Sequence, residues 1–294
     1  MQRFFTKQVV VGILVLAALV VGAIAFVNLG KTPEPPAAEP IEVQKPDPKT
    51  EVIGTSVEGR SITAYTYGSG AKHLLFVGGM HGGYEWNSIL LAYAFMDYLK
   101  ANPTVVPVGL AVTVIPSANP DGVYKVVGTE GRFTTANVSP DAATAAAGRF
   151  NANNVDLNRN FDCNWQATST WQGRPVSAGT AVFSEPETKA IRSFVLKHTP
   201  DAVVFWHSQA NAVYASECNK GILPGTLSVM SAYARAAGYP AIASFDAYPI
   251  TGDAEGWLAS INIPAITVEL KTHETIEWEK NLAGIKALIS FYGQ

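Results

Sequence analysis

The stretch GGMHGGYEWNS at residues 78–88 places His81 in a glycine-rich segment, four residues before Glu85. The run before it, HLLFV at residues 73–77, predicts a short buried strand, and residues 86–99 after it predict a helix. His81 therefore follows a strand and precedes a helix, which is where open α/β sheets bind their ligands.

Predicted strands and helices alternate in the same way through the rest of the chain. Strands are expected at residues 61–67, 74–77, 106–115, 202–206 and 265–269, and helices at 86–98, 184–199, 227–237 and 275–292. The S-x-x-E pattern at residues 184–187 predicts a capping box at the start of the second helix. Residues 116–183 lack such periodicity, and we expect a long functional loop there. The alternation predicts an α/β fold whose mostly parallel sheet is covered on both faces.

Residues 1–30 have a different character from the rest of the chain. Arg3 and Lys7 precede an unbroken apolar run at residues 9–27, which as a helix would measure about 28 Å and could cross a bilayer. We expect a membrane anchor, with a signal peptide cut near residues 23–25 (AIA) as the alternative. In both cases the basic end stays in the cytoplasm and the remainder is exported.

Residues 31–50 hold six prolines and predict an extended linker, followed by a folded domain at residues 51–294. The formal net charge of −3 and the absence of a basic stripe argue against nucleic acid as a partner. In an exported domain, Cys163 and Cys218 are expected to form a disulfide, with two separate thiols as the alternative.

Three short apolar runs lead into a residue that can bind a metal or transfer a proton, namely His81, His207 and Glu269. Zinc hydrolases require two imidazoles and one carboxylate as ligands and a further carboxylate that accepts a proton from water. Glu85 and Glu269 could supply these two carboxylates. The alternative for each histidine is a buried ring that hydrogen-bonds within the core.

Other catalytic patterns fit less well. The sequence contains no G-x-S-x-G, and the segment HETIE at residues 273–277 lacks the second histidine of H-E-x-x-H. We expect that segment to begin the last helix. The segment RFNANNVDLNRNF at residues 149–161 contributes Arg149 and Arg159, which could hold a carboxylate or a developing oxyanion. A solvated loop with structural arginines is the alternative.

Several motifs in this order resemble those of the M14 zinc carboxypeptidases, and the similarity covers nearly all of residues 51–294. The motifs are GGMHGGYEW, SANPDGVY at 117–124, RFNANNVDLNRNF at 149–161, FWHSQANAVY at 205–214, YPITGDAEGW at 248–257 and TVEL at 267–270. They are most similar to those of bacterial members that cleave cell-wall peptides. The resemblance implies a three-layer α/β/α sandwich on a mixed, mostly parallel eight-stranded sheet, with one zinc ion.

The resemblance also implies catalytic roles. His81, Glu85 and His207 correspond to the zinc ligands, Glu269 to the general base, and Arg149 to the group that polarises the scissile carbonyl. The ligand spacing here is H-x-x-x-E, one residue longer than the family's usual H-x-x-E. The extra residue would turn a helical side chain by about 100°, and we expect the two glycines after His81 to absorb this change.

For the substrate, the resemblance implies that Asn158 and Arg159 hold its terminal carboxylate and that Tyr248 is a mobile residue that closes over the bound substrate. Asp253 and Glu255 fall in the segment that lines the pocket for the terminal side chain, where an acid would favour a basic group; solvent-facing acids are the alternative.

We therefore expect an extracytoplasmic zinc metallocarboxypeptidase that acts on peptides or muropeptides. The alternatives are a zinc-dependent deacylase of N-acyl amino acids and a catalytically silent binding module.

Overall fold

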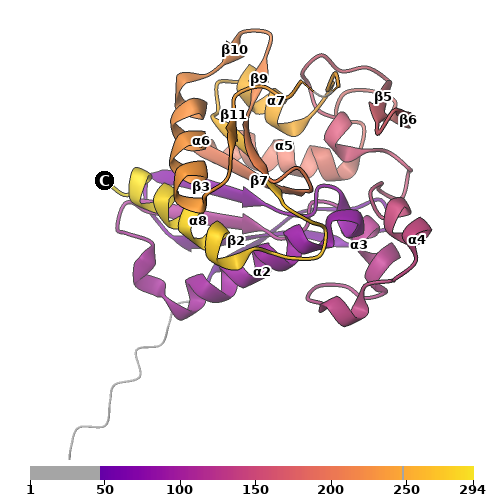
Figure 1. Ribbon diagram of the computed structural model, residues 1–294. Helices are drawn as coiled ribbons and strands as arrows, with labels where there is room; N and C mark the ends of the chain where they lie inside the picture. Colours follow the sequence, from indigo (N-terminus) through magenta and orange to yellow (C-terminus); the bar gives the residue numbers. More distant parts are fainter. Residues whose placement is uncertain (1–46, 247) are drawn as a thin grey trace, which may run out of the picture. The chain divides into compact units, whose positions relative to one another are not determined.

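The computed structural model describes residues 47–246 and 248–294 (Figure 1). The anchor expected at residues 1–30 and most of the linker expected at 31–50 lie outside these residues. Among the described residues, no helix has the length and apolar character needed to span a bilayer. The domain was expected from residue 51 and its first strand from residue 61, but a strand that was not expected already begins at Lys49.

An eight-stranded sheet with the order β1-β2-β4-β3-β7-β12-β8-β11 forms the centre of the domain. Its strands are β1 (Lys49–Thr55), β2 (Ser61–Gly68), β3 (Lys72–Val77), β4 (Leu110–Ile115), β7 (Ala202–Ser208), β8 (Ala212–Ala215), β11 (Ala241–Ile242) and β12 (Ala265–Leu270). The central strands β4, β3, β7 and β12 are parallel, whereas β1, β2 and β8 introduce antiparallel pairs. The expected mixed, mostly parallel sheet is therefore confirmed.

Helices cover both faces of this sheet (Figure 1). Because successive strand residues point to opposite faces, Leu74 and Phe76 of β3 enter one core, while Leu75 and Val77 enter the other. The first core also contains residues of α2 (Trp86–Ala101), α6 (Pro224–Ala237) and α8 (Trp278–Tyr292), and the second contains residues of α5 (Pro186–His198) and α7 (Ala254–Ser260). These layers form the expected α/β/α sandwich.

Some expected element boundaries were wrong. The capping box at residues 184–187 does not form, because Pro186 begins α5 and the N-cap is Glu185. The strand expected from residue 106 begins only at Leu110, after the 3₁₀ turn η2 (Pro103–Val105). The last helix begins at Trp278, so residues 273–277 form a loop instead of its first turn.

The segment 116–183 is more regular than expected. It contains α3 (Pro120–Val127), α4 (Ala142–Ala147), the 3₁₀ turns η3 (Thr135–Asn137) and η4 (Leu157–Arg159), and the hairpin β5 (Thr168–Trp171)–β6 (Arg174–Ser177). Buried polar side chains hold it together: Asn160 donates to the carbonyls of Ala178 and Ala181 and accepts from the amide of Glu185. Hydrophobic periodicity therefore gives little sign of its structure.

The expected disulfide between Cys163 and Cys218 is present. It joins the loop after η4 to β9 (Glu217–Cys218), which pairs with β10 (Gly221–Ile222).

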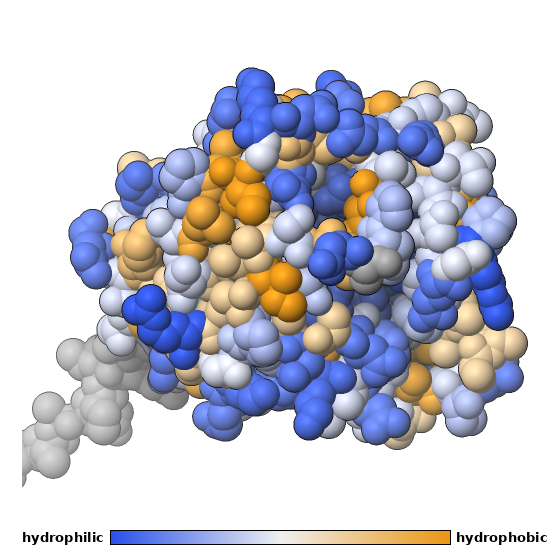
Figure 2. Space-filling view, turned by 45° about the horizontal axis from the view of Figure 1, so that its top comes forward, coloured by the Kyte–Doolittle hydropathy of each residue, from blue (hydrophilic) through white to orange (hydrophobic). Residues whose placement is uncertain are grey.

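On the face drawn in Figure 2, hydrophobic residues form small separate patches among polar ones, in keeping with the burial of apolar side chains in the two cores.

Candidate active site

All the residues predicted for the site line one cavity of about 600 Å³. They are His81, Glu85, Arg149, Asn158, Arg159, His207, Tyr248, Asp253, Glu255 and Glu269, together with both cysteines of the disulfide. The cavity lies at the carboxyl ends of β3, β7 and β12, the edge of the sheet at which the sequence predicted it.

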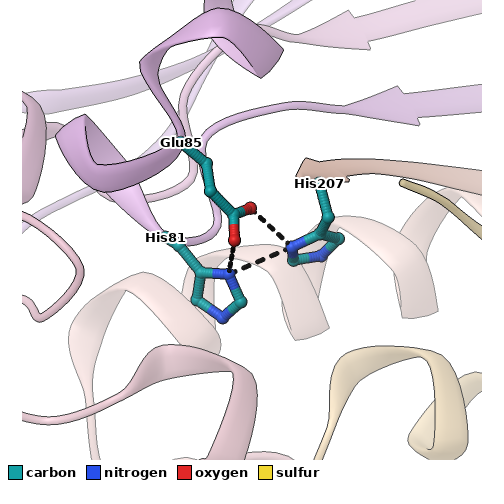
Figure 3. A group of neighbouring side chains, drawn as sticks. All are labelled: His81, Glu85 and His207. Atoms are coloured by element: carbon teal, nitrogen blue, oxygen red, sulfur yellow. Dashed lines mark hydrogen bonds and ion pairs between the residues drawn. The ribbon is translucent and has the colours of Figure 1, made fainter. Parts of the chain in front are cut away.

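His81, Glu85 and His207 turn their side chains toward one another (Figure 3). The Nδ1 atom of His81 lies 2.8 Å from one carboxylate oxygen of Glu85, and the Nδ1 atom of His207 lies 2.9 Å from the other. The two Nδ1 atoms are 3.1 Å apart. All three side chains are almost completely buried.

These distances fit a zinc ion. Tetrahedral coordination with bonds of about 2.1 Å separates ligand atoms by about 3.4 Å, and the three donor atoms already lie near that separation.

The electrostatics of these three residues also favour a cation. Although burial opposes its charge, His81 and His207 hold the pKa of Glu85 below its usual range. Burial likewise opposes a charged His207, but Glu85 and Glu255 raise the pKa of that ring well above its usual value.

The glycines of the turn allow the longer ligand spacing. Residues Gly82–Glu85 form the 3₁₀ turn η1, and Gly82 has φ +44°, in the left-handed region that favours glycine. A Cβ atom on Gly82 would lie 2.5 Å from the carbonyl oxygen of Gly148, and one on Gly83 would lie 2.4 Å from Val126. The extra residue is therefore accommodated in a tight turn before α2, and Glu85 reaches both histidines.

His207 and Glu269 are placed by the sheet itself. They are register partners on the parallel strands β7 and β12. The residues directly before them, Trp206 and Val268, point into the core with α2, α6 and α8, so His207 and Glu269 point to the opposite face of the sheet. Burial, with a further contribution from Glu85, raises the pKa of Glu269 to about 7. Its Oε2 atom has no hydrogen-bond partner among the described residues, so the group is available to a bound molecule.

Asp156 connects the predicted arginine to the predicted ligands. It accepts hydrogen bonds from Nε and Nη2 of Arg149, at 3.0 and 2.8 Å, and lies 3.5 Å from Nε2 of His81. Burial opposes its charge, but Arg149 and His81 keep the pKa of Asp156 well below its usual range. Sequence reasoning missed this residue; the available signal was an acid between two arginines in the motif at 149–161.

Arg159 is a buried cation with incomplete pairing. Its Nη1 and Nη2 atoms donate to the carbonyls of Asn158 and Thr170, at 2.7 and 3.4 Å. Its Nε atom has no hydrogen-bond partner, and it forms no ion pair within the described part of the chain. A buried guanidinium in this state favours an anion. Asn158 is fixed beside it, because its Oδ1 accepts from the amide of Ala254 at 2.9 Å.

The two acids of the predicted side-chain pocket already have partners within the protein. Asp253 is the N-cap of α7 and accepts from the amide of Gly256 at 2.7 Å. Glu255 accepts from Oγ1 of Thr267 at 3.1 Å and lies 3.4 Å from Nε2 of His207. Burial raises the pKa of Asp253 to about 6, and Glu255 adds to this effect. Glu255 is buried and Asp253 is half-buried, so neither is the fully solvent-facing acid of the alternative.

An aromatic wall at one end of the cavity was not predicted. Tyr84, Trp171 and His273 line it, with ring centroids 5.1 Å apart for Tyr84 and Trp171 and 4.6 Å apart for Tyr84 and His273. His273 belongs to the loop that was expected to be helical, and its Nδ1 atom lies 2.7 Å from Oγ of Ser208. At another part of the lining, Tyr248 lies against Phe245, with ring centroids 4.9 Å apart.

Comparisons with known proteins bear on the family and on the fold of this chain. A family model described as zinc carboxypeptidase matches residues 39–283. Carboxypeptidase Z from Rattus norvegicus is 34% identical over 126 residues, covering 38% of this chain but only 18% of that protein. The crystal structure of murein-tripeptide amidase MpaA from Escherichia coli O157 aligns with a TM-score of 0.61 at 23% identity, over 82% of this chain and 92% of that chain. Carboxypeptidase A from Helicoverpa armigera aligns with a TM-score of 0.60 at 19% identity, over 83% and 67%. At such identities the two structures support the fold alone.

Proposed function

The chain belongs to the zinc carboxypeptidase family of hydrolases, and we propose that it removes residues from peptides with a free C-terminal carboxylate. One observation carries the proposal: a buried two-histidine, one-carboxylate cluster shares its cavity with a carboxylate whose Oε2 atom has no hydrogen-bond partner and a buried arginine that forms no ion pair, both judged among the described residues. The first group suits a zinc ion, the second a general base and the third a substrate carboxylate.

His81, Glu85 and His207 would hold the ion, which when bound acts as a Lewis acid and lowers the pKa of water. Glu269 accepts the proton of the attacking water and passes it to the leaving amine. Arg149, held by Asp156, stabilises the negative charge that develops on the scissile carbonyl oxygen.

The substrate is held at its C-terminal end. Arg159 and Asn158 bind the terminal carboxylate, and Tyr248 closes over it. Asp253 and Glu255 give the adjoining pocket a negative character, which favours a basic group on the terminal residue. Peptidoglycan stem peptides, which can end in a diamino acid, meet both requirements. The fold shared with a murein-tripeptide amidase makes them the first natural substrates to test.

The proposed location is outside the cytoplasm, with the N-terminal apolar run as anchor or as cleaved signal. The disulfide between Cys163 and Cys218 supports this proposal, because such bonds persist in oxidising compartments. The proline-rich residues after the apolar run would then hold the catalytic domain away from the membrane surface.

The direct test is digestion of defined substrates by the purified protein, with products identified by mass spectrometry. The panel contains peptides that end in lysine, alanine or phenylalanine, the same peptides amidated at the C-terminus, a stem tripeptide ending in diaminopimelate, and N-acyl amino acids. We expect release of single C-terminal residues, fastest for basic ends, with loss of activity in chelator and after amidation. Equal cleavage of amidated peptides, or cleavage of N-acyl amino acids alone, would contradict the proposal.

A further inference from the structure

Both histidines of the cluster turn their second ring nitrogen toward a buried carboxylate. Nε2 of His81 lies 3.5 Å from Oδ1 of Asp156, and Nε2 of His207 lies 3.4 Å from Oε1 of Glu255. Neither Nε2 atom has a hydrogen-bond partner at normal geometry within the described residues. A metal on Nδ1 leaves the proton on Nε2, and a buried N–H group requires an acceptor.

The carboxylate of Glu255 is held in place to serve as that acceptor. Glu255 is only 4% exposed, and its Oε1 atom, the one nearest His207, also accepts from Oγ1 of Thr267 at 3.1 Å. Its backbone belongs to the first turn of α7, which Asp253 caps. Thr267 lies on β12, two residues before Glu269, so helix and strand together fix the position of the carboxylate.

We propose that Glu255 is a positioning residue for His207, and not solely a recognition group for the substrate. Its carboxylate fixes the His207 tautomer with the proton on Nε2, orients Nδ1 toward Glu85 and makes Nδ1 a stronger donor to a metal. Such outer carboxylates typically change metal affinity 10- to 100-fold. The inference rests on the proposed function only in taking the bound ion to be zinc.

The test measures zinc affinity by competition with a chromophoric chelator, in the absence of any substrate. Glu255→Leu removes both charge and acceptor, and we expect it to weaken zinc binding by about 100-fold. Glu255→Gln keeps an amide oxygen facing Nε2 and should lose about 10-fold. Thr267→Val removes the hydroxyl group that holds the Glu255 carboxylate but keeps the carboxylate itself. It should therefore weaken zinc binding less than Glu255→Gln does.

Glu187→Gln is the matched control. Glu187 is also fully buried and lies in the first turn of a helix, α5, but its oxygens accept from the amide of Val57 and from Nδ2 of Asn151, away from the cavity. This variant should bind zinc like the wild-type protein. Circular dichroism of each variant checks that it is folded. If Glu255→Leu does not fold, the Glu255→Gln affinity decides, and a value equal to wild type overturns the proposal.

A role confined to the substrate would give a different result. Zinc affinity would then be unchanged in every Glu255 variant, and only the KM for peptides with basic C-termini would rise; that pattern overturns the inference. Failure of the proposed function is separately visible. A wild-type protein that binds zinc but hydrolyses no peptide refutes the peptidase proposal, while the affinities of the variants still test the role of Glu255.

Discussion

The two halves of the candidate metal site are built in different ways. On one side, His207 and Glu269 are register partners on adjacent parallel strands, and the hydrogen-bond ladder of the sheet fixes their separation. On the other side, His81 and Glu85 lie in a turn whose path depends on Gly82 and Gly83 having no side chains. The strand half should therefore tolerate changes in side-chain chemistry without structural loss, whereas the turn half should fail structurally when its backbone is crowded.

Glu269→Gln gives the largest expected effect and tests the strand half. The amide has the same size but cannot accept the proton, so kcat should fall by about 10² to 10⁴-fold. Bound zinc, measured by atomic absorption, and the thermal midpoint should stay near wild type, because the ladder between β7 and β12 is unchanged. Near-normal turnover would refute the assignment of Glu269 as base, and loss of zinc would show that the strand half is less independent of its chemistry than we infer.

The disulfide between Cys163 and Cys218 belongs to neither half, although both of its cysteines line the cavity. In the chain-entropy model, closing the 55-residue separation between Cys163 and Cys218 stabilises the fold by about 4 kcal/mol. The double Cys→Ser variant should lose a comparable free energy of unfolding in urea, and the wild-type protein should lose it on reduction. Zinc affinity should change little in the folded protein; a large drop would mean that the disulfide also positions the ligands.

Gly82→Ala tests the turn half. A Cβ atom there would meet the carbonyl oxygen of Gly148 at 2.5 Å and the backbone of Gly122 at 2.9 Å, in a residue with positive φ. We expect a loss of about 2–5 kcal/mol in the free energy of unfolding, combining backbone strain and overpacking, together with weaker zinc binding.

Gly59→Ala is the control for that variant. Gly59 also has positive φ, at +83°, but an added Cβ would meet no atom within 4 Å. Gly59→Ala should lower the free energy of unfolding by the backbone strain alone, about 1–2 kcal/mol, and should leave zinc affinity unchanged. Equal effects of the two substitutions would show that crowding around the turn contributes nothing, and the contrast between the two halves would then be lost.

The same contrast explains what the sequence could predict. Apolar runs ending in His207 and Glu269 are local signals, and parallel strands bring their carboxyl ends together, so this half and the sheet followed from the pattern. The convergence of Glu85 with the histidines depends on a 3₁₀ turn packed against Gly122 and Gly148. Those contacts are distant in sequence, and a count of residues between ligands could not establish them.

Segments held by polar side chains were the least predictable. Asn160 satisfies three backbone groups between residues 178 and 185, and Asp156 ties Arg149 to the turn half. Neither residue contributes to a hydrophobic periodicity that could be detected in the sequence. The loop before α8 was taken for helix for a similar reason. Asn87 holds it by donating to the carbonyls of Thr272 and Thr275, and helical propensity alone does not reveal such a contact.

The smallest expected effect comes from the opposite end of β3, the strand that leads into the turn. His73 is buried, its Nε2 atom lies 2.8 Å from Oγ1 of Thr113, and burial lowers its pKa below the usual 6.5. The unfolded chain therefore takes up this proton at a higher pH than the folded protein does. The associated stability is complete above about pH 6.5 and is lost as the pH falls toward the folded pKa, by at most about 1.4 kcal/mol per pH unit. In His73→Gln this contribution disappears, so the free energy of unfolding, measured in urea from pH 7 to pH 5, should decline less steeply than in the wild-type protein.

Zinc affinity and turnover of the His73→Gln variant at pH 7 should be unchanged, because the strand ladder, and not the chemistry of its first residues, determines where the turn begins. A change in either would show that the strand passes perturbations on to the turn half, and the two halves could no longer be treated as separately supported.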